Sequence, residues 1–335
     1  MELYLDSANL KEIEAAFKLG FLDGLTTTPT FMHREGITNI DGTIVQLSKM
    51  VPVLQIEALG NSAEEIIDEA QRILDLGLDK TKTVFKIPIS LEGARACKML
   101  RNKDFLVNLH LIYTVQQAYI ALSAGATYVC PLVGRLQDQG HDALSVVEQC
   151  VNAVYNYNYP SKIMFSSVRN PEHVRNALNL GVHTCTIPWN VMQQLTQNHF
   201  TALGTQQFIE HTKLMTVKVK DVIRKHPGRI LASKSILDAL VQMTVSKFGA
   251  ISIVDTDDNL LGIFTDGDLR RIIEREGESV LSRKLSDLDM KQPITIDAEA
   301  YLIESSTIFK QSKVDTIVVT SNGKPVGMLD IQDLL

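Results

Sequence analysis

The first 200 residues of the chain alternate short apolar runs with longer stretches of helical period. Strands that alternate with helices predict repeated βα units around a parallel sheet. Eight such units in about 210 residues match a compact (β/α)8 barrel, the TIM barrel, with a doubly wound sheet as the alternative. The runs are "ELYLDS", "GLTTTP", "VLQIEAL", "TVFKIPIS", "FLVNLHLI", "TYVCPLV", "KIMFSSV" and "HTCTIPW".

The pattern changes near residue 215, where an internal repeat begins. "GAISIVDTDDNLLGIFTDGDLRR" matches "VDTIVVTSNGKPVGMLDIQDLL" in order, with a strand, a polar turn, a second strand and an acidic helix start. Gly262 pairs with Gly327 and Asp268 with Asp333, both at an offset of 65. Two copies of one unit therefore form a second domain. We predict a barrel over 1–212 and two modules over about 213–277 and 278–335.

Composition limits the partners and the location of the chain. A net charge of −6 gives no electrostatic reason to expect nucleic acid or an anionic membrane as a main partner. The 4 cysteines are far apart and form no CxxC pair, which predicts neither a zinc site nor a disulfide framework. The charged N-terminal segment does not fit a signal peptide, and no apolar run approaches the length of a membrane span. We expect a cytoplasmic protein.

Polar residues interrupt the apolar runs at positions that should face inward. Alternate side chains of a barrel strand point to its interior, and those near the carboxyl end face the active-site mouth. A buried charge without a partner costs several kcal/mol, so such residues must be paired, neutralised or functional. The period selects Asp6, Thr28, Glu57, Lys86, Asn108, His110 and Ser167. Asn108 is expected to bind the substrate.

Lys86, within "TVFKIPIS", allows two interpretations. It can form a structural ion pair with Asp6 or Glu57. Alternatively, it is a Schiff-base lysine, because burial among apolar neighbours disfavours the ammonium form and a neutral amine can attack a carbonyl. A nearby carboxylate would then serve as the acid or base for proton transfer. We favour a catalytic trio of Asp6, Glu57 and Lys86.

Five segments occur in order between residue 1 and about residue 210: "MELYLDSANLKEIE", "DGLTTTPTFM", "FKIPIS", "ATYVCPLVGRLQDQG" and "SSVRNPEHVRNAL". They closely resemble the transaldolase family, particularly its short subfamily that includes the fructose 6-phosphate aldolases. The resemblance implies a cofactor-free class I enzyme that acts on sugar phosphates and forms a homo-oligomer. It gives Lys86 the Schiff base, Asp6 a proton transfer at the hydroxyl where the carbon bond breaks, and Glu57 the catalytic water. The implied phosphate-binding residues are Arg135, Ser167 and Arg169.

Three residues depart from the family pattern. Thr28 stands where the family usually has an Asn that hydrogen-bonds the lysine-bound substrate. His110 replaces a water-holding Thr, and is interpreted either as a core histidine or as a proton shuttle or water orienter. Leu132 replaces an aromatic residue.

Transfer of a dihydroxyacetone unit is the leading hypothesis. Release of free dihydroxyacetone and a catalytically altered sugar-phosphate sensor or scaffold are the alternatives.

The repeat resembles a tandem pair of cystathionine β-synthase (CBS) modules, and "GIFTDGDLRR" is similar to the pair on arabinose 5-phosphate isomerases. The resemblance implies an adenine nucleotide or nucleotide-sugar effector near Thr265 and Asp268. The second copy keeps Asp333, but Asp330 replaces the hydroxyl residue and would repel a phosphate, so we expect one nucleotide site; dimerisation alone is the alternative. "DTDDN" opens like a calcium loop but lacks Gly at the sixth position, Leu260, so we expect no metal.

Overall fold

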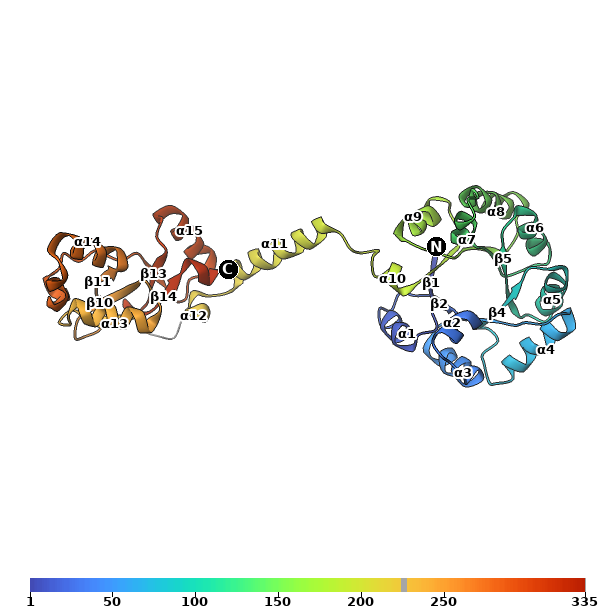
Figure 1. Ribbon diagram of the computed structural model, residues 1–335, viewed down its shortest axis with the longest axis horizontal. Coiled ribbons are helices and arrows are strands. Elements are labelled where there is room, and N and C mark those ends of the chain that lie inside the picture. Colours follow the sequence, from blue (N-terminus) through green and yellow to red (C-terminus); the bar gives the residue numbers. More distant parts are fainter. Residues whose placement is uncertain (224–227, 335) are drawn as a thin grey trace. The chain divides into compact units, whose positions relative to one another are not determined.

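The computed structural model describes residues 1–223 and 228–334. These residues form two compact units, one from Met1 to Gln197 and one from Asn198 onward (Figure 1). Each unit has its own hydrophobic core.

The first unit is a closed barrel of parallel strands in which β1 pairs with both β2 and β8. This confirms the predicted (β/α)8 barrel. The strands are β1 (Glu2–Asp6), β2 (Gly24–Thr26), β3 (Leu54–Glu57), β4 (Thr83–Pro88), β5 (Leu106–Ile112), β6 (Tyr128–Pro131), β7 (Lys162–Phe165) and β8 (Thr184–Ile187).

Helices surround this barrel and bury the outward face of its strands (Figure 1). Most begin at a polar residue whose side chain accepts hydrogen bonds from the first free backbone N–H groups, as Ser62 does for α4 and Asn170 for α9. They are α1 (Leu10–Phe17), α2 (Pro29–Arg34), α3 (Ile40–Met50), α4 (Ala63–Leu74), α5 (Leu91–Arg101), α6 (Val115–Ser123), α7 (Val133–Asp138), α8 (Ala143–Tyr157), α9 (Pro171–Asn179) and α10 (Trp189–Met192).

The second unit contains two similar three-stranded sheets, ordered β11-β10-β9 and β12-β13-β14. Gly262 lies opposite Ile253 and Gly327 opposite Val319, and both hairpins have a register shift at that point. The two copies inferred from the sequence are therefore two copies of one fold. The strands are β9 (Arg229–Leu231), β10 (Ala250–Val254), β11 (Leu260–Thr265), β12 (Thr295–Asp297), β13 (Thr316–Ser321) and β14 (Lys324–Asp330).

Helices cover these sheets and extend the unit at its N-terminal end. They are α11 (His199–Thr216), α12 (Val219–Val222), α13 (Ile236–Ser246), α14 (Asp266–Glu276) and α15 (Leu302–Ser312), with 3-10 turns η1 (Glu278–Ser282), η2 (Leu285–Asp287) and η3 (Ile331–Leu334). Among the helices within the described ranges, none combines the length and the hydropathy needed to cross a membrane.

The boundaries differ from those drawn on the sequence at 212 and 277. Helix α11 belongs to the second unit, which begins at Asn198. Val219, from the segment after α11, packs in the core of the second module, and Val280 and Leu285 pack in the core of the first. The core of each module thus includes residues from the sequence range assigned to the other module. The constant spacing between the two copies does not predict this.

Gly24 opens β2 at a point where the barrel wall leaves no room for a side chain. A Cβ at this position would lie 2.4 Å from Tyr4 Cε1 and 2.7 Å from the carbonyl oxygen of Val53. Tyr4 is itself buried and hydrogen-bonded to Tyr128, so it cannot easily move aside.

We expect Gly24→Ala to lower the free energy of unfolding of the barrel by about 1–3 kcal/mol, the usual cost of overpacking. Trp189 is the chain's 1 tryptophan and packs against the barrel core, so its fluorescence during urea unfolding reports on this unit. Gly204→Ala in α11, where a Cβ meets no atom within 4 Å, is the control and should leave this transition unchanged. Equal stability of the Gly24 variant and the wild type would contradict the expectation.

Candidate active site

A cavity of about 890 Å³ opens at the carboxyl ends of the barrel strands. In parallel barrels this end carries the active site. Side chains at the ends of all eight strands line it, including Asp6, Thr26, Glu57, Lys86, His110, Cys130, Ser166 and Thr186. The cavity therefore collects polar residues that lie far apart in the sequence.

Lys86 lies in the wall of this cavity and is almost fully buried. The parallel register of β3 and β4 places it beside Glu57, and its Nζ lies 3.0 Å from Glu57 Oε1. Nζ also donates a hydrogen bond to the carbonyl oxygen of Thr27 at 3.0 Å. Both side chains of the ion pair are 7% exposed. The structural ion pair considered for Lys86 thus exists, and Lys86 also lines the cavity.

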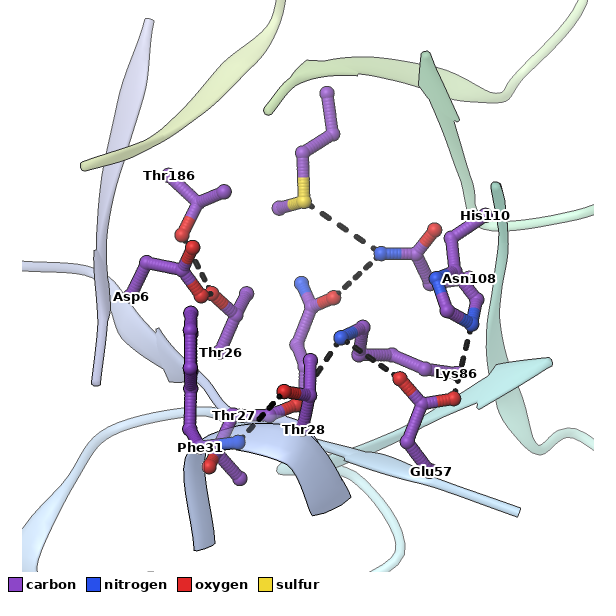
Figure 2. Close-up of polar contacts among 12 residues, drawn as sticks. Asp6, Thr26, Thr27, Thr28, Phe31, Glu57, Lys86, Asn108, His110 and Thr186 are labelled. Atoms are coloured by element: carbon purple, nitrogen blue, oxygen red, sulfur yellow. Dashed lines mark hydrogen bonds and ion pairs between the residues drawn. The ribbon is translucent and has the colours of Figure 1, made fainter. Parts of the chain in front are cut away.

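Glu57 connects Lys86 to His110 (Figure 2). His110 Nε2 lies 2.9 Å from Glu57 Oε2, the carboxylate oxygen not used by the lysine. Burial raises the pKa of Glu57, but the adjacent Lys86 and His110 outweigh it, so the pKa falls below its usual value. Burial lowers the pKa of His110, and Glu57 only partly offsets this. An ionised carboxylate only accepts hydrogen bonds, so neutral His110 carries its hydrogen on Nε2.

Asp6 lies on another side of the same cavity and has different partners (Figure 2). Its Oδ1 accepts a hydrogen bond from Thr26 Oγ1 at 2.8 Å, and Thr26 is in turn hydrogen-bonded to Thr186. Burial raises the pKa of Asp6, although Lys86 and the Thr26 hydroxyl oppose the shift. The strand pattern alone singled out neither threonine. The period of two that selected Thr28 also points to Thr26, but a threonine in a strand is too common to stand out.

Arg135, Ser167 and Arg169 line the cavity at the ends of β6 and β7. Ser167 has a φ of 60°, in the left-handed region, which turns the chain there. A Cβ on Gly134 would lie 2.1 Å from the carbonyl oxygen of Ser167, so only glycine permits this approach. Arg169 Nη2 is held by Asp138 at 2.9 Å. The result is a cationic corner with a hydroxyl group, suited to a phosphate.

The comparison with known proteins decides the family. The model "Transaldolase/Fructose-6-phosphate aldolase" matches residues 3–250 of this chain. The chain belongs to the transaldolase/fructose-6-phosphate aldolase family. Its relatives include a "Probable transaldolase" of Coprothermobacter proteolyticus, 38% identical over 209 residues, which are 62% of this chain and 95% of the relative. Another, from Syntrophobacter fumaroxidans, is 36% identical over 214 residues, 63% of this chain and 96% of the relative. This chain is an enzyme of the transaldolase type.

The structure shows the contacts of two residues that depart from the transaldolase pattern, Thr28 and Leu132. Thr28 Oγ1 accepts a hydrogen bond from Phe31 N at 3.2 Å and caps α2, which leaves its hydroxyl proton available to the cavity. Leu132 is buried, directly precedes α7 and lines the cavity without offering a polar side chain. Both residues contact the space where a substrate of this family would bind.

Asn108 lies outside the set of residues that line the cavity. It is fully buried, and its Nδ2 donates to Gln55 Oε1 at 2.7 Å and contacts Met164 Sδ at 3.5 Å. Its inward orientation agrees with the strand period. The other barrel residues singled out from the sequence all line the cavity.

A model described as "CBS domain" matches residues 285–335 of the second unit. Here Thr265 and Asp268 form the capping box of α14, with reciprocal bonds between each side chain and the other residue's N–H. Lys291 and Arg271 also contact Asp268 Oδ1. Burial raises the pKa of Asp268, but these partners lower it to about 2. Asp333 accepts a hydrogen bond from the backbone N–H of Asp330 at 2.9 Å. The two modules therefore present different chemistry at equivalent positions.

The depressed pKa of His110 makes a prediction for pH-dependent stability. Unfolded histidine titrates near ~6.5. As the pH falls below this value, the unfolded chain binds a proton that folded His110 rejects, so the barrel loses stability. We expect His110→Asn to reduce the slope of unfolding free energy against pH, between about pH 6.5 and 5, by up to about 1.4 kcal/mol per unit.

Urea unfolding followed by Trp189 fluorescence at several pH values measures this slope. His33→Asn removes an exposed histidine and is the matched control, with the wild-type slope expected. A wild-type slope in the His110 variant would mean that His110 takes up its proton as readily in the folded barrel as in the unfolded chain.

Proposed function

We propose that the barrel transfers a dihydroxyacetone unit between sugar phosphates through a Schiff base on Lys86. The observation that carries this proposal is a lysine nitrogen at the wall of a closed-barrel cavity, 3.0 Å from an ionisable carboxylate. A buried amine beside a proton acceptor can become a nucleophile. Because the protonated imine itself accepts the electrons of the broken carbon bond, the cycle needs no cofactor.

The first half of the cycle would use Lys86 and Glu57. The neutral Nζ adds to the C2 carbonyl of a ketose phosphate such as fructose 6-phosphate, and Glu57 takes up the proton that the amine loses. The resulting carbinolamine regains a proton and loses water to give the protonated imine. His110, which donates to Glu57 from Nε2, holds this carboxylate in place and leaves Nδ1 as an acceptor for a water molecule.

The second half would use Asp6. Its carboxylate takes the proton of the C4 hydroxyl while the bond between C3 and C4 breaks and the electrons pass into the imine, forming an enamine. The aldehyde phosphate leaves. The enamine then attacks an acceptor aldehyde, Asp6 returns the proton to the new hydroxyl, and water releases the product from Lys86.

The remaining cavity residues would bind the sugar chain. Arg135, Ser167 and Arg169 form a cationic corner that fits the phosphate, and the free proton of Thr28 can donate to a substrate oxygen. Asn108 would act from beneath the cavity, by supporting its wall through Gln55, rather than by touching the sugar. A homo-oligomer is our expectation for the assembly.

We further propose that the second unit regulates the enzyme by binding an adenine nucleotide or a nucleotide sugar. The site would lie at Thr265 and Asp268, where α14 begins and backbone N–H groups favour an anion. Lys291 and Arg271 stand at the same place and would reach the phosphate groups. In the second module Asp330 would repel a phosphate, which leaves one site.

Borohydride trapping tests the Schiff base. With fructose 6-phosphate, the wild type should gain a stable adduct that mass mapping places on Lys86, and Lys86→Met should give none. Lys82→Met, four residues earlier and exposed, is the matched control and should trap as the wild type does. An adduct absent from the wild type, or unchanged in the Lys86 variant, rejects the proposal. Erythrose 4-phosphate or glyceraldehyde 3-phosphate as acceptor then separates transfer from release of free dihydroxyacetone.

Thermal shift measurements with AMP, ATP and nucleotide sugars test the effector site. A ligand that binds the folded state at 100 times its Kd should stabilise the second unit by about 2.7 kcal/mol. Asp268→Ala should abolish the shift. Asp257→Ala, at an exposed turn of the same module, should preserve it. If none of these ligands raises the melting temperature of the wild type, the module pair serves dimerisation instead.

A further inference from the structure

Thr26 and Thr186 form a pair of hydroxyl groups beside Asp6 that the catalytic scheme above does not use (Figure 2). β1 lies between β2 and β8 in the barrel, so the inward side chains of both neighbours meet next to Asp6. Thr26 is 2% exposed and Thr186 is 3% exposed, and both line the cavity. Burying two hydroxyl groups costs free energy unless both are hydrogen-bonded.

A count of protons fixes the direction of these bonds when Asp6 is ionised. Thr26 Oγ1 lies near three possible partners: Asp6 Oδ1 at 2.8 Å, the carbonyl oxygen of Leu5 at 3.3 Å, and Thr186 Oγ1. A hydroxyl has one proton and two lone pairs. If Thr26 donates to the carboxylate, it must accept from Thr186, so the Thr186 hydroxyl directs the Thr26 proton toward Asp6.

The same atoms serve the protonated state without movement. When Oδ2 has taken the substrate proton, Oδ1 is the carbonyl oxygen of the carboxyl group and still accepts the hydrogen bond from Thr26 Oγ1. The hydroxyl pair therefore provides a partner for Asp6 both before and after it accepts a proton. A group that must act first as base and then as acid needs this property.

We propose that Thr26 and Thr186 are positioning residues that occupy Asp6 Oδ1 in both protonation states and so leave Oδ2 for the substrate hydroxyl. This inference rests on the proposed function, because it concerns the proton step assigned to Asp6. It adds two residues, from β2 and β8, to the machinery of carbon bond cleavage.

Other groups also face Asp6 and must stay constant in any test. Lys86 and Arg135 favour its ionised form, and Glu57 opposes it. Asp6 also acts on the thiols of Cys130 on β6 and Cys185 on β8, but burial raises their pKa values to about 11 and about 12, so they stay neutral near pH 7. A change at Thr26 or Thr186 alters none of these residues.

Thr186→Val and Thr26→Val test the inference, with cleavage of fructose 6-phosphate and its pH profile as readouts. Loss of the Thr26 bond to the charged carboxylate, or of the Thr186 bond that orients Thr26, should lower kcat about tenfold or more and change KM little. Because the Thr26 hydroxyl lowers the pKa of Asp6, its loss raises that pKa and moves the acid limb of kcat/KM to higher pH. Thr→Ser at each position should restore both quantities.

Thr184→Val is the matched control. Thr184 lies two residues earlier on β8, is fully buried, and its hydroxyl donates to the carbonyl of Ile163 at 3.4 Å. It should keep the wild-type pH profile. A variant that loses rate without a shifted acid limb, or keeps both rate and limb, overturns the inference, since a merely structural role would not move the titration.

Borohydride trapping separates this inference from the proposed function. Thr186→Val retains Lys86 and should still give the adduct, so an adduct missing from the wild type rejects the function alone. Carbon-13 NMR of labelled aspartate carboxyl groups then titrates Asp6 directly, without any need for activity. An unchanged Asp6 titration in both valine variants overturns the inference, and if Thr26→Val does not fold, Thr186→Val and Thr186→Ser decide it.

Discussion

The ion pair between Lys86 and Glu57 is the constraint around which the barrel interior is organised. Removing either charge from water costs several kcal/mol, and deleting one partner of such a pair typically costs about 3–5 kcal/mol. The structure meets this cost with the carbonyl of Thr27 on the lysine side and with His110 on the glutamate side. Each added partner satisfies a hydrogen-bonding atom that would otherwise be buried alone. The strand ends that supply these partners are thereby fixed in register.

Much of this arrangement could be predicted from the sequence, because two periodicities decide it. The alternation of strands and helices predicts the barrel, and the period of two within each strand predicts that Lys86 and Glu57 point inward. Asn108 obeys the same period but precedes His110 by two residues, which is roughly 6.6 Å of strand, and so lies below the cavity. Inward direction follows from the sequence, whereas depth follows from where each strand ends.

Contacts made across the closed barrel could not be predicted. Thr26 and Thr186 are 160 residues apart and meet only because β8 returns to β1. In the sequence, each threonine has the pattern of an ordinary strand residue. The domain boundary could not be predicted for a similar reason, since α11 continues a helical pattern and Val219 joins a core made by buried residues 77 to 110 positions later. These contacts depend on the pairing of distant segments, which the local sequence pattern does not predict.

The two carboxyl groups of the cavity have environments that move their pKa values apart. Burial raises the pKa of Asp6, whose hydroxyl partner is Thr26, whereas the neighbouring Lys86 and His110 lower the pKa of Glu57. Such a separation gives the two carboxyl groups different acid–base roles. Asp6 is then suited to take and return the substrate proton, and Glu57 to stabilise a positive charge on Lys86 Nζ. Because the imine of the proposed cycle is positive when protonated, ionised Glu57 would favour it once the carbinolamine has regained its proton, and His110 would support that role by holding the far oxygen of the carboxylate.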